Sequence, residues 1–139
     1  MTRDARAAAI ASVAVLAVII VGFRVLGGPG TQRLVRSDER TVRTMVGLAQ
    51  QIKARFRGEE LPANLENFPE KQRQEPLTKR PFIYHVKSKT AYELCATFAT
   101  DNRQSQPPEP DDAWRHSQGE SCFQLDVTRD VPQFPYFQD

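Results

Sequence analysis

The chain is poor in the residues from which catalytic and metal centres are most often built. Its 139 residues include two cysteines, two histidines and one tryptophan. The sequence has no Cys-x-x-Cys-His pattern for haem attachment, no phosphate-binding loop and no dinucleotide-binding glycine pattern. Ser117 and Ser121 have no Gly-x-Ser-x-Gly context. These absences exclude the enzyme classes that such motifs define.

The remaining reactive side chains are also poorly arranged for chemistry. The four residues that could together hold zinc are Glu93, Cys95, His116 and Cys122, and no two of them have the spacing of a ligand pair. The carboxylates of Asp111 and Asp112 fall in a predicted loop, which cannot hold the geometry that acid–base catalysis needs. We therefore expect no enzyme activity, catalytic residue, metal, cofactor or small-molecule substrate.

A strong excess of charge is missing as well. The formal net charge is +2, and lysine and arginine are scattered among aspartate and glutamate. Nucleic-acid binding needs basic side chains in blocks that neutralise several phosphates. We therefore expect no nucleic-acid partner.

What the sequence does have is a long apolar run near its start. Residues 7–23 contain no acid, base or amide; Arg24 follows, and a Gly-Gly-Pro-Gly breaker occupies 27–30. A hydrocarbon core of about 30 Å needs roughly 20 apolar residues in a helix, and Arg24 can snorkel to the interface. We predict a flank over 1–6 and a transmembrane helix over 7–26, with Ala7, Phe23 and Leu26 in the anchor.

The alternative interpretation of this run is a cleaved signal peptide. Arg3 and Arg6 would form its basic start. The run is long for such a peptide, however, and no small-x-small cleavage site follows it cleanly. We therefore favour an uncleaved anchor in contact with the lipid bilayer.

A hinge over 27–33 and an amphipathic helix over 34–57 are predicted next, with Thr31 as the helix cap. Its apolar stripe comprises Val42, Met45, Ala49, Ile52 and Phe56. In one interpretation the stripe packs on a sheet of the same domain. In the other, Val42, Met45 and Ile52 contact a partner subunit, or the helix lies at the lipid headgroups.

Three strands are predicted in the second half, over 81–88, 90–98 and 121–127, because apolar residues alternate there. The loop around 61–69 carries apolar anchors, and the polar segment 70–75 is expected to be exposed. Cys95 and Cys122 both fall on the faces opposite the apolar stripes of their strands. If the strands are neighbours, the two sulfur atoms can form a disulfide that contributes about 3 kcal/mol.

The final segment, residues 130–139, is an extended tail that contains two prolines and the aromatic residues Phe134, Tyr136 and Phe137. Exposing so many aromatics to water is unfavourable. The tail either lies across its own domain or docks these three side chains on a neighbouring subunit.

The predicted order of elements resembles the fold of type IV pilins and type II secretion pseudopilins. The local amino-acid sequence resembles that of a set of uncharacterised bacterial membrane-anchored proteins with pilin-like bodies. The most specific matches are Tyr-Glu-Leu-Cys-Ala-Thr-Phe at 92–98 and Trp-x-His-x-x-Gly-x-x-Cys-Phe at 114–123; weaker ones lie at 32–40, 61–65 and 75–82. The resemblance implies an α+β, pilin-like domain over 34–129 and no catalytic activity.

The sequence also departs from these families. The apolar run has no glutamate near its start and no prepilin cleavage glycine before it. Glu75 and Lys79 stand in a turn where the pilin-like family tends to have aspartate and glycine, so we expect no calcium site there.

We expect a non-catalytic, single-pass accessory subunit of a larger bacterial membrane complex that stabilises neighbouring membrane subunits. The expected host is a bioenergetic assembly, such as a respiratory complex or a photosynthetic reaction centre with its antenna. The alternative is a pseudopilin-like component of a secretion or pilus system. The arginines after the run favour a cytoplasmic body by the positive-inside rule. The cysteine pair favours a periplasmic body anchored in the inner membrane, and this is the location that we expect.

Overall fold

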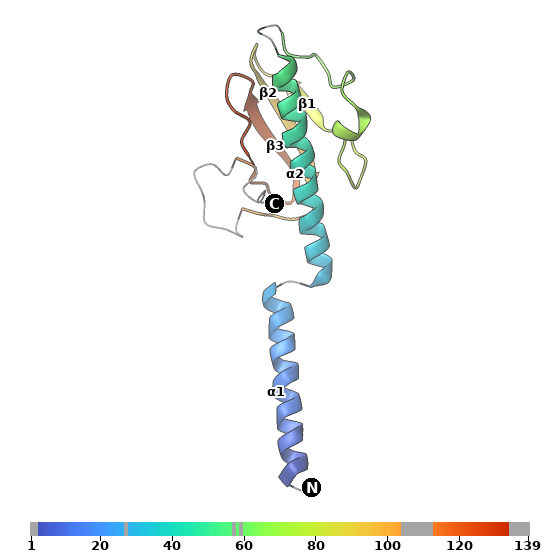
Figure 1. Cartoon of the computed structure of the whole chain (residues 1–139), viewed down its shortest axis with the longest axis vertical. Coiled ribbons are helices and arrows are strands. Elements are labelled where there is room, and N and C mark those ends of the chain that lie inside the picture. The colour runs from blue at the N-terminus through green and yellow to red at the C-terminus, as the bar shows by residue number, and fades with distance from the viewer. Residues whose placement is uncertain (1–2, 27, 57, 59, 104–112, 134–139) are drawn as a thin grey trace. The chain divides into compact units, whose positions relative to one another are not determined.

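The computed structural model describes residues 3–26, 28–56, 58, 60–103 and 113–133 (Figure 1). The chain divides into two units, Met1–Arg33 and Leu34–Asp139. The first contains helix α1 (Arg3–Leu26) and the beginning of helix α2 (Pro29–Arg55). The second contains the rest of α2 and a small three-stranded sheet. This is an α+β layout, as the sequence predicts.

Both ends of α2 differ from the prediction. The helix begins at Pro29 rather than at 34, so the predicted hinge over 27–33 is wrong in length and Thr31 lies inside the helix instead of capping it. The reason is Pro29, because proline suits the first helical position, where a missing N–H costs nothing. The helix ends at Arg55, two residues before the predicted end. Gly58, just beyond, has a φ of 82°, which favours glycine.

The sheet is an antiparallel meander in the order β1-β2-β3, formed by β1 (Ile83–Val86), β2 (Ala91–Phe98) and β3 (Gly119–Asp126). The first strand is half as long as the predicted 81–88. Pro81 has no N–H to donate to a neighbouring strand. The N–H of Phe82 instead donates to the carbonyl of Arg73 at 2.9 Å, as part of a short antiparallel bridge between Gln74 and Pro81.

The core lies where the apolar stripe of α2 meets the inward face of the sheet. Val42, Met45, Ala49 and Ile52 are at most 1% exposed. The alternate residues of β2 and β3 that face them are buried too: Tyr92, Leu94, Ala96, Phe98, Phe123 and Leu125. The predicted inward faces of these two strands are therefore confirmed. Burying one large aliphatic side chain contributes about 1.5–3 kcal/mol, so this interface dominates the stability of the body.

Two buried carboxylates fasten the end of β2. The carboxylate of Asp38 on α2 accepts hydrogen bonds from the N–H groups of Ala99 (2.9 Å) and Thr100 (2.7 Å) and from the Thr100 hydroxyl (2.6 Å). The carboxylate of Glu75 accepts the N–H of Thr97 at 2.8 Å and the hydroxyl of Thr78. Glu75 is 2% exposed, so its predicted exposure is wrong. Its carboxylate occupies the place where a longer β1 would have supplied a carbonyl.

Replacing Asp38 with alanine should destabilise the body by about 3 kcal/mol. Two part-buried backbone N–H groups, those of Ala99 and Thr100, would lose their acceptor, and each orphaned group costs about 1–3 kcal/mol when it is shielded from water. Urea unfolding followed by the fluorescence of Trp114, the single tryptophan, measures the change. Glu39, the partly exposed neighbour of Asp38, provides the control: Glu39→Ala should change stability by less than about 0.5 kcal/mol. Equal stability of the two variants would contradict the role of the Asp38 carboxylate.

Candidate functional site

The largest uncovered apolar surface of the described chain is α1. It is the one helix there that is long and apolar enough to cross a membrane. Phe23 is 59% exposed and Val25 is 78% exposed. The hydroxyl of Ser12 donates to the carbonyl of Ala8 at 2.9 Å, so this polar group needs no partner outside the helix. Ala7 and Leu26 lie in α1, and their side chains are outside the described set.

The residues of α2 that were predicted to contact a partner lie in the core and not on the surface. Val42, Met45 and Ile52 are 1%, 0% and 0% exposed, inside the core of their own domain. This agrees with the interpretation in which the stripe packs on its own sheet, and it corrects the one in which these side chains contact a partner. A partner cannot reach them while the core is intact. The other predicted contacts, Phe134, Tyr136 and Phe137, lie outside the described residues.

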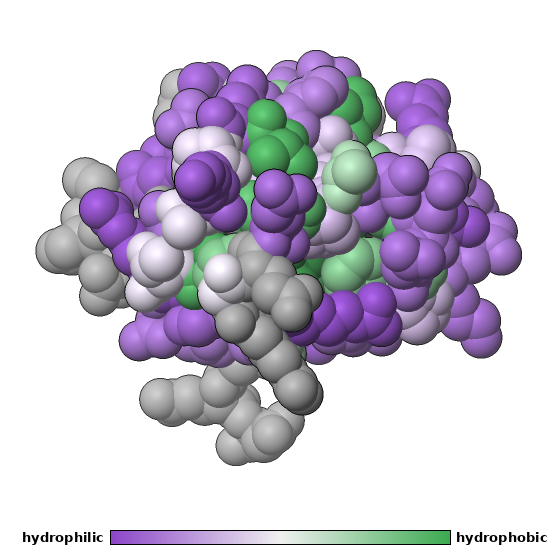
Figure 2. Space-filling view, turned by 90° about the horizontal axis from the view of Figure 1, so that it is seen from above, coloured by the Kyte–Doolittle hydropathy of each residue, from purple (hydrophilic) through white to green (hydrophobic). Residues whose placement is uncertain are grey.

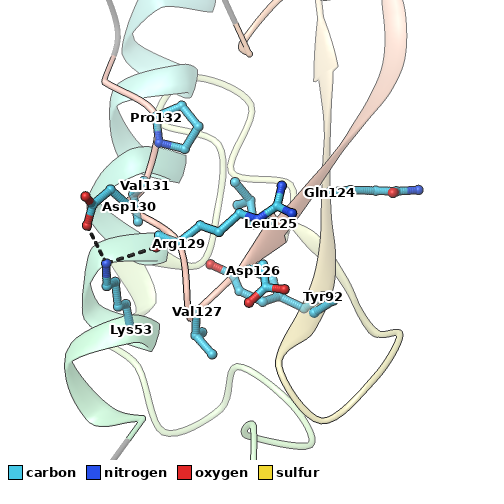
Figure 3. A pocket seen from close by; sticks show the side chains of 11 residues that line it. Lys53, Tyr92, Gln124, Leu125, Asp126, Val127, Arg129, Asp130, Val131 and Pro132 are labelled. Carbon is cyan, nitrogen blue, oxygen red and sulfur yellow. Dashed lines mark hydrogen bonds and ion pairs between the residues drawn. The ribbon is translucent and has the colours of Figure 1, made fainter. Parts of the chain in front are cut away.

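The beginning of the tail is held on the body by Lys53 and Trp114, and neither contact was predicted from the sequence. The ammonium of Lys53 on α2 lies 2.7 Å from the Asp130 carboxylate and donates to the carbonyl of Arg129 at 2.9 Å (Figure 3). The indole N–H of Trp114 donates to the carbonyl of Pro132 at 2.8 Å. The two Lys53 contacts join residues that are 76 and 77 positions apart in the sequence, and the Trp114 contact joins residues that are 18 positions apart. No local pattern in the sequence could have indicated them.

A groove of about 360 Å³ lies beside these contacts (Figure 3). It is lined by the end of β3, by Tyr92 and Lys53, and by the chain from Val127 to Pro132. The Lys53 ammonium holds the pKa of Asp130 below its usual range, and hydrogen bonds from Thr128 do the same for Asp126. Both carboxylates therefore stay ionised at neutral pH and cannot supply a proton.

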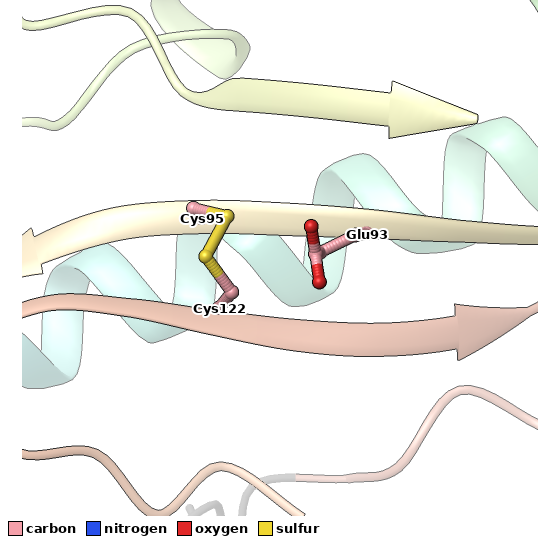
Figure 4. Close-up of side chains that lie close together, drawn as sticks. All are labelled: Glu93, Cys95 and Cys122. Atoms are coloured by element: carbon pink, nitrogen blue, oxygen red, sulfur yellow. A yellow bond between two sulfur atoms is a disulfide. The ribbon is translucent and has the colours of Figure 1, made fainter. Parts of the chain in front are cut away.

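Cys95 and Cys122 form the predicted disulfide. They are opposite each other in β2 and β3, with sulfur atoms 2.06 Å apart and α-carbons 4.0 Å apart (Figure 4). Among the described residues, Glu93, Cys95 and Cys122 are the group of three potential metal ligands whose ligand atoms all lie within 4.8 Å of one another. Zinc is bound by cysteine thiolates, however, and both sulfur atoms here are used in the disulfide. The Glu93 carboxylate pairs with Lys87 at 3.0 Å.

His116 is buried beside the end of β2. It is 3% exposed, and its ring stacks on Phe98 with the centroids 3.8 Å apart. Its Nδ1 atom has no hydrogen-bond partner among the described residues. Burial lowers the pKa of this imidazole, and this effect outweighs the opposing pull of the Asp38 charge and of the Ser117 and Thr100 backbone. His116 is therefore a core residue of the body, stacked on Phe98.

Stability should fall as the pH drops below about 6.5. The folded-state pKa of His116 is lowered, so the folded protein keeps a neutral imidazole where the unfolded chain, with an ordinary pKa near 6.5, already binds a proton. Between pH 7 and 5.5 this linkage removes at most about 1 kcal/mol. Urea unfolding at each pH tests the expectation. His116→Phe should flatten the profile, whereas His85→Gln, which removes an exposed imidazole, should leave it. A slope that persists in His116→Phe would contradict the assignment.

Comparisons of the chain with models of protein families, with curated proteins and with solved structures found no match in any of the three. The resemblance to pilin-like proteins therefore stays a prediction from sequence. The geometry itself provides an apolar helix of membrane-spanning length and a small α+β body braced by a disulfide.

Proposed function

We propose that this chain is a non-catalytic, single-pass subunit of a larger bacterial membrane complex, in which it stabilises neighbouring subunits. The observation that carries the proposal is the surface of α1. Ile10, Val18 and Val25 are 71%, 73% and 78% exposed, and none of the apolar window of the helix is buried by the described chain. A continuous apolar surface of this size needs lipid or protein around it.

The composition of the body supports a role without chemistry. The face seen in Figure 2 is mostly hydrophilic, as expected of a surface in contact with water. Of the four buried polar residues in the described chain, Asp38 and Glu75 accept structural hydrogen bonds. His116 has no nucleophile or carboxylate hydrogen-bonded to it there. No set of these groups meets the geometric requirements of a catalytic site.

The disulfide supports a location. Disulfides persist in the bacterial periplasm and are rare in the cytoplasm, where thiols are kept reduced. We therefore propose that α1 is an inner-membrane anchor and that the body lies in the periplasm. The host that we propose is a bioenergetic complex, of the respiratory or photosynthetic kind.

Co-purification in mild detergent, with the tag on the amino terminus to leave the tail unaltered, identifies the host. A fixed stoichiometry with a bioenergetic core would support the proposal. Recovery with pilus or secretion ATPase components would support a pseudopilin role in its place. A chain recovered alone would contradict both.

Two arginines in the middle of α1 should abolish anchoring. An arginine at the centre of a membrane helix costs about 2.5–3.5 kcal/mol on the insertion scale, so Val13→Arg with Val18→Arg removes most of the driving force. The double variant should leave the membrane pellet on carbonate extraction, whereas Val13→Leu with Val18→Leu should stay there. The intact mass of the pelleted protein tests for cleavage. A product that lacks α1 would contradict the proposal that α1 is an uncleaved membrane anchor.

The cysteines should be oxidised in cells. Protein denatured in acid and treated with a maleimide-polyethylene glycol should show no shift on a gel before reduction and two additions after it. Cys95→Ser leaves one thiol and should show one addition without reduction, which confirms that the reagent reaches it. Cys95→Ser with Cys122→Ser should lose about 3 kcal/mol of stability. Two additions to the unreduced native chain would contradict a periplasmic body.

A further inference from the structure

The disulfide joins the interior strand of the sheet to one of its edge strands. Cys95 lies on β2, which has a neighbour on each side, whereas Cys122 lies on β3, beyond which the described chain has no further strand. The exposure of the two residues differs accordingly, because Cys95 is 2% exposed and Cys122 is exposed. A molecule in solution therefore reaches Cys122 more easily than Cys95.

The direction of the S–S bond determines how each sulfur atom can be attacked. A disulfide is exchanged when a thiolate attacks one sulfur atom and the other leaves, and the three sulfur atoms lie nearly in a line during this step. The bond runs across the strands, from β2 to β3 (Figure 4). An attack on Cys122 therefore comes over the edge of the sheet beyond β3, whereas an attack on Cys95 comes from the side of β1.

The approach from the side of β1 is occupied by Ile83. This residue is directly opposite Cys95 in the pairing of β1 with β2, so the two side chains lie on the same face of the sheet. The β-carbons of such a pair are about 4.5–5.5 Å apart, which brings an isoleucine side chain against the sulfur. Because β3 is an edge strand of the described sheet, Cys122 has no cross-strand neighbour on its outer side.

The charge near the disulfide affects the rate of exchange rather than its site. An oxygen of the Glu93 carboxylate lies within 4.8 Å of both sulfur atoms. It repels an incoming thiolate and disfavours the negative charge that develops on the departing sulfur. The Lys87 ammonium, 3.0 Å from this carboxylate, offsets part of the effect. Exchange is therefore slowed at both sulfur atoms, and the choice between them is left to access.

We propose that Cys122 is the residue through which this disulfide exchanges with an external dithiol, and that Cys95 is the resolving thiol. A thiolate of the dithiol attacks the Sγ atom of Cys122, the S–S bond breaks, and Cys95 leaves as a thiolate that takes a proton from water. The second thiol of the dithiol loses its proton and attacks its own partner sulfur in the mixed disulfide. Cys122 is then released as a thiolate, and the dithiol is oxidised to a disulfide.

Formation of the bridge follows the same steps in reverse, so Cys122 carries the mixed disulfide and Cys95 closes the bond. The partner is thus a protein with a reactive pair of thiols, and the contact that it needs is the open edge of β3. The inference goes beyond the proposed function and depends neither on α1 nor on a host complex.

The test maps the first adduct that forms on the native full chain in mild detergent. The protein is treated briefly with excess glutathione, quenched in acid, alkylated and digested with trypsin. Cleavage after Lys89, Arg103, Arg115 and Arg129 places the two cysteines in separate peptides. Glutathione should be on Cys122 at least about five times as often as on Cys95. A smaller ratio, or no adduct on a native chain whose unfolded form glutathione reduces, would overturn the inference.

The single-cysteine variants provide a second measurement in the oxidising direction. The Cys122 thiol of Cys95→Ser should react with oxidised glutathione at least about fivefold faster than the Cys95 thiol of Cys122→Ser. Tryptophan fluorescence checks that both variants are folded during the reaction. Equal rates in two folded variants would contradict the assignment of Cys122.

Shielding by Ile83 is tested with a matched pair of variants. Ile83→Ala opens the approach from β1 and should raise the share of adduct on Cys95 about threefold or more. Val86 is an aliphatic residue of similar exposure, 46% against 39%, and alternation places it on the other face of the same strand. Val86→Ala should leave the share unchanged. The same share in both variants would show that Ile83 does not protect Cys95.

The effect of Glu93 is measured as a rate. Glu93→Gln should speed the reaction with glutathione about two- to fivefold and leave Cys122 as the main site. Glu66→Gln removes the same charge from an exposed loop residue and should not change the rate. A main adduct that moves to Cys95 in Glu93→Gln would overturn the assignment of the site to access.

Discussion

The packing of α2 against one face of the sheet is the constraint on which the rest of the structure depends. The stripe that contains Met45 and Ile52 covers the inward faces of β2 and β3. Because side chains alternate along a strand, fixing the inward face also fixes the outward one. Cys95 and Cys122 are therefore outward together and can bond. On the helix, the same packing leaves Arg36, Arg40 and Arg43 on the side that faces solvent.

The edges of this small sheet are completed by side chains rather than by more strands. A domain of this size has few hydrogen bonds to spare, and each unpaired N–H in its interior is costly. Glu75 accepts the N–H of Thr97 beyond the end of the short β1, and Asp38 accepts those of Ala99 and Thr100. These carboxylates have structural partners, which removes them from the residues that could carry out chemistry.

Periodicity allowed the apolar helix, the amphipathic stripe, the three strands and the cysteine pair to be predicted from sequence. It could not indicate the helix start, because Pro29 was interpreted as a breaker when it occupies the first helical position. Nor could it indicate pairs distant in sequence, such as Lys53 with Asp130 or Trp114 with Pro132. The backbone of the turn after Glu75 is a further feature that periodicity does not indicate. Lys79 there has a φ of 60°, the left-handed conformation that glycine adopts most easily, and no pattern in the sequence predicted it.

The arginines after α1 oppose a periplasmic body if every one of them is counted, since the positive-inside rule retains basic segments in the cytoplasm. The rule applies to short flanks, whereas folded domains cross largely regardless of their charge. Arg36, Arg40 and Arg43 belong to a helix whose other side forms the core of the body, so in the proposed orientation they would cross with that domain. The flanks that remain are Arg3 and Arg6 before the apolar run, and Arg24 and Arg33 after it. Counted in this way, the two flanks carry two arginines each, so the positive-inside rule no longer opposes the periplasmic body that we propose from the disulfide.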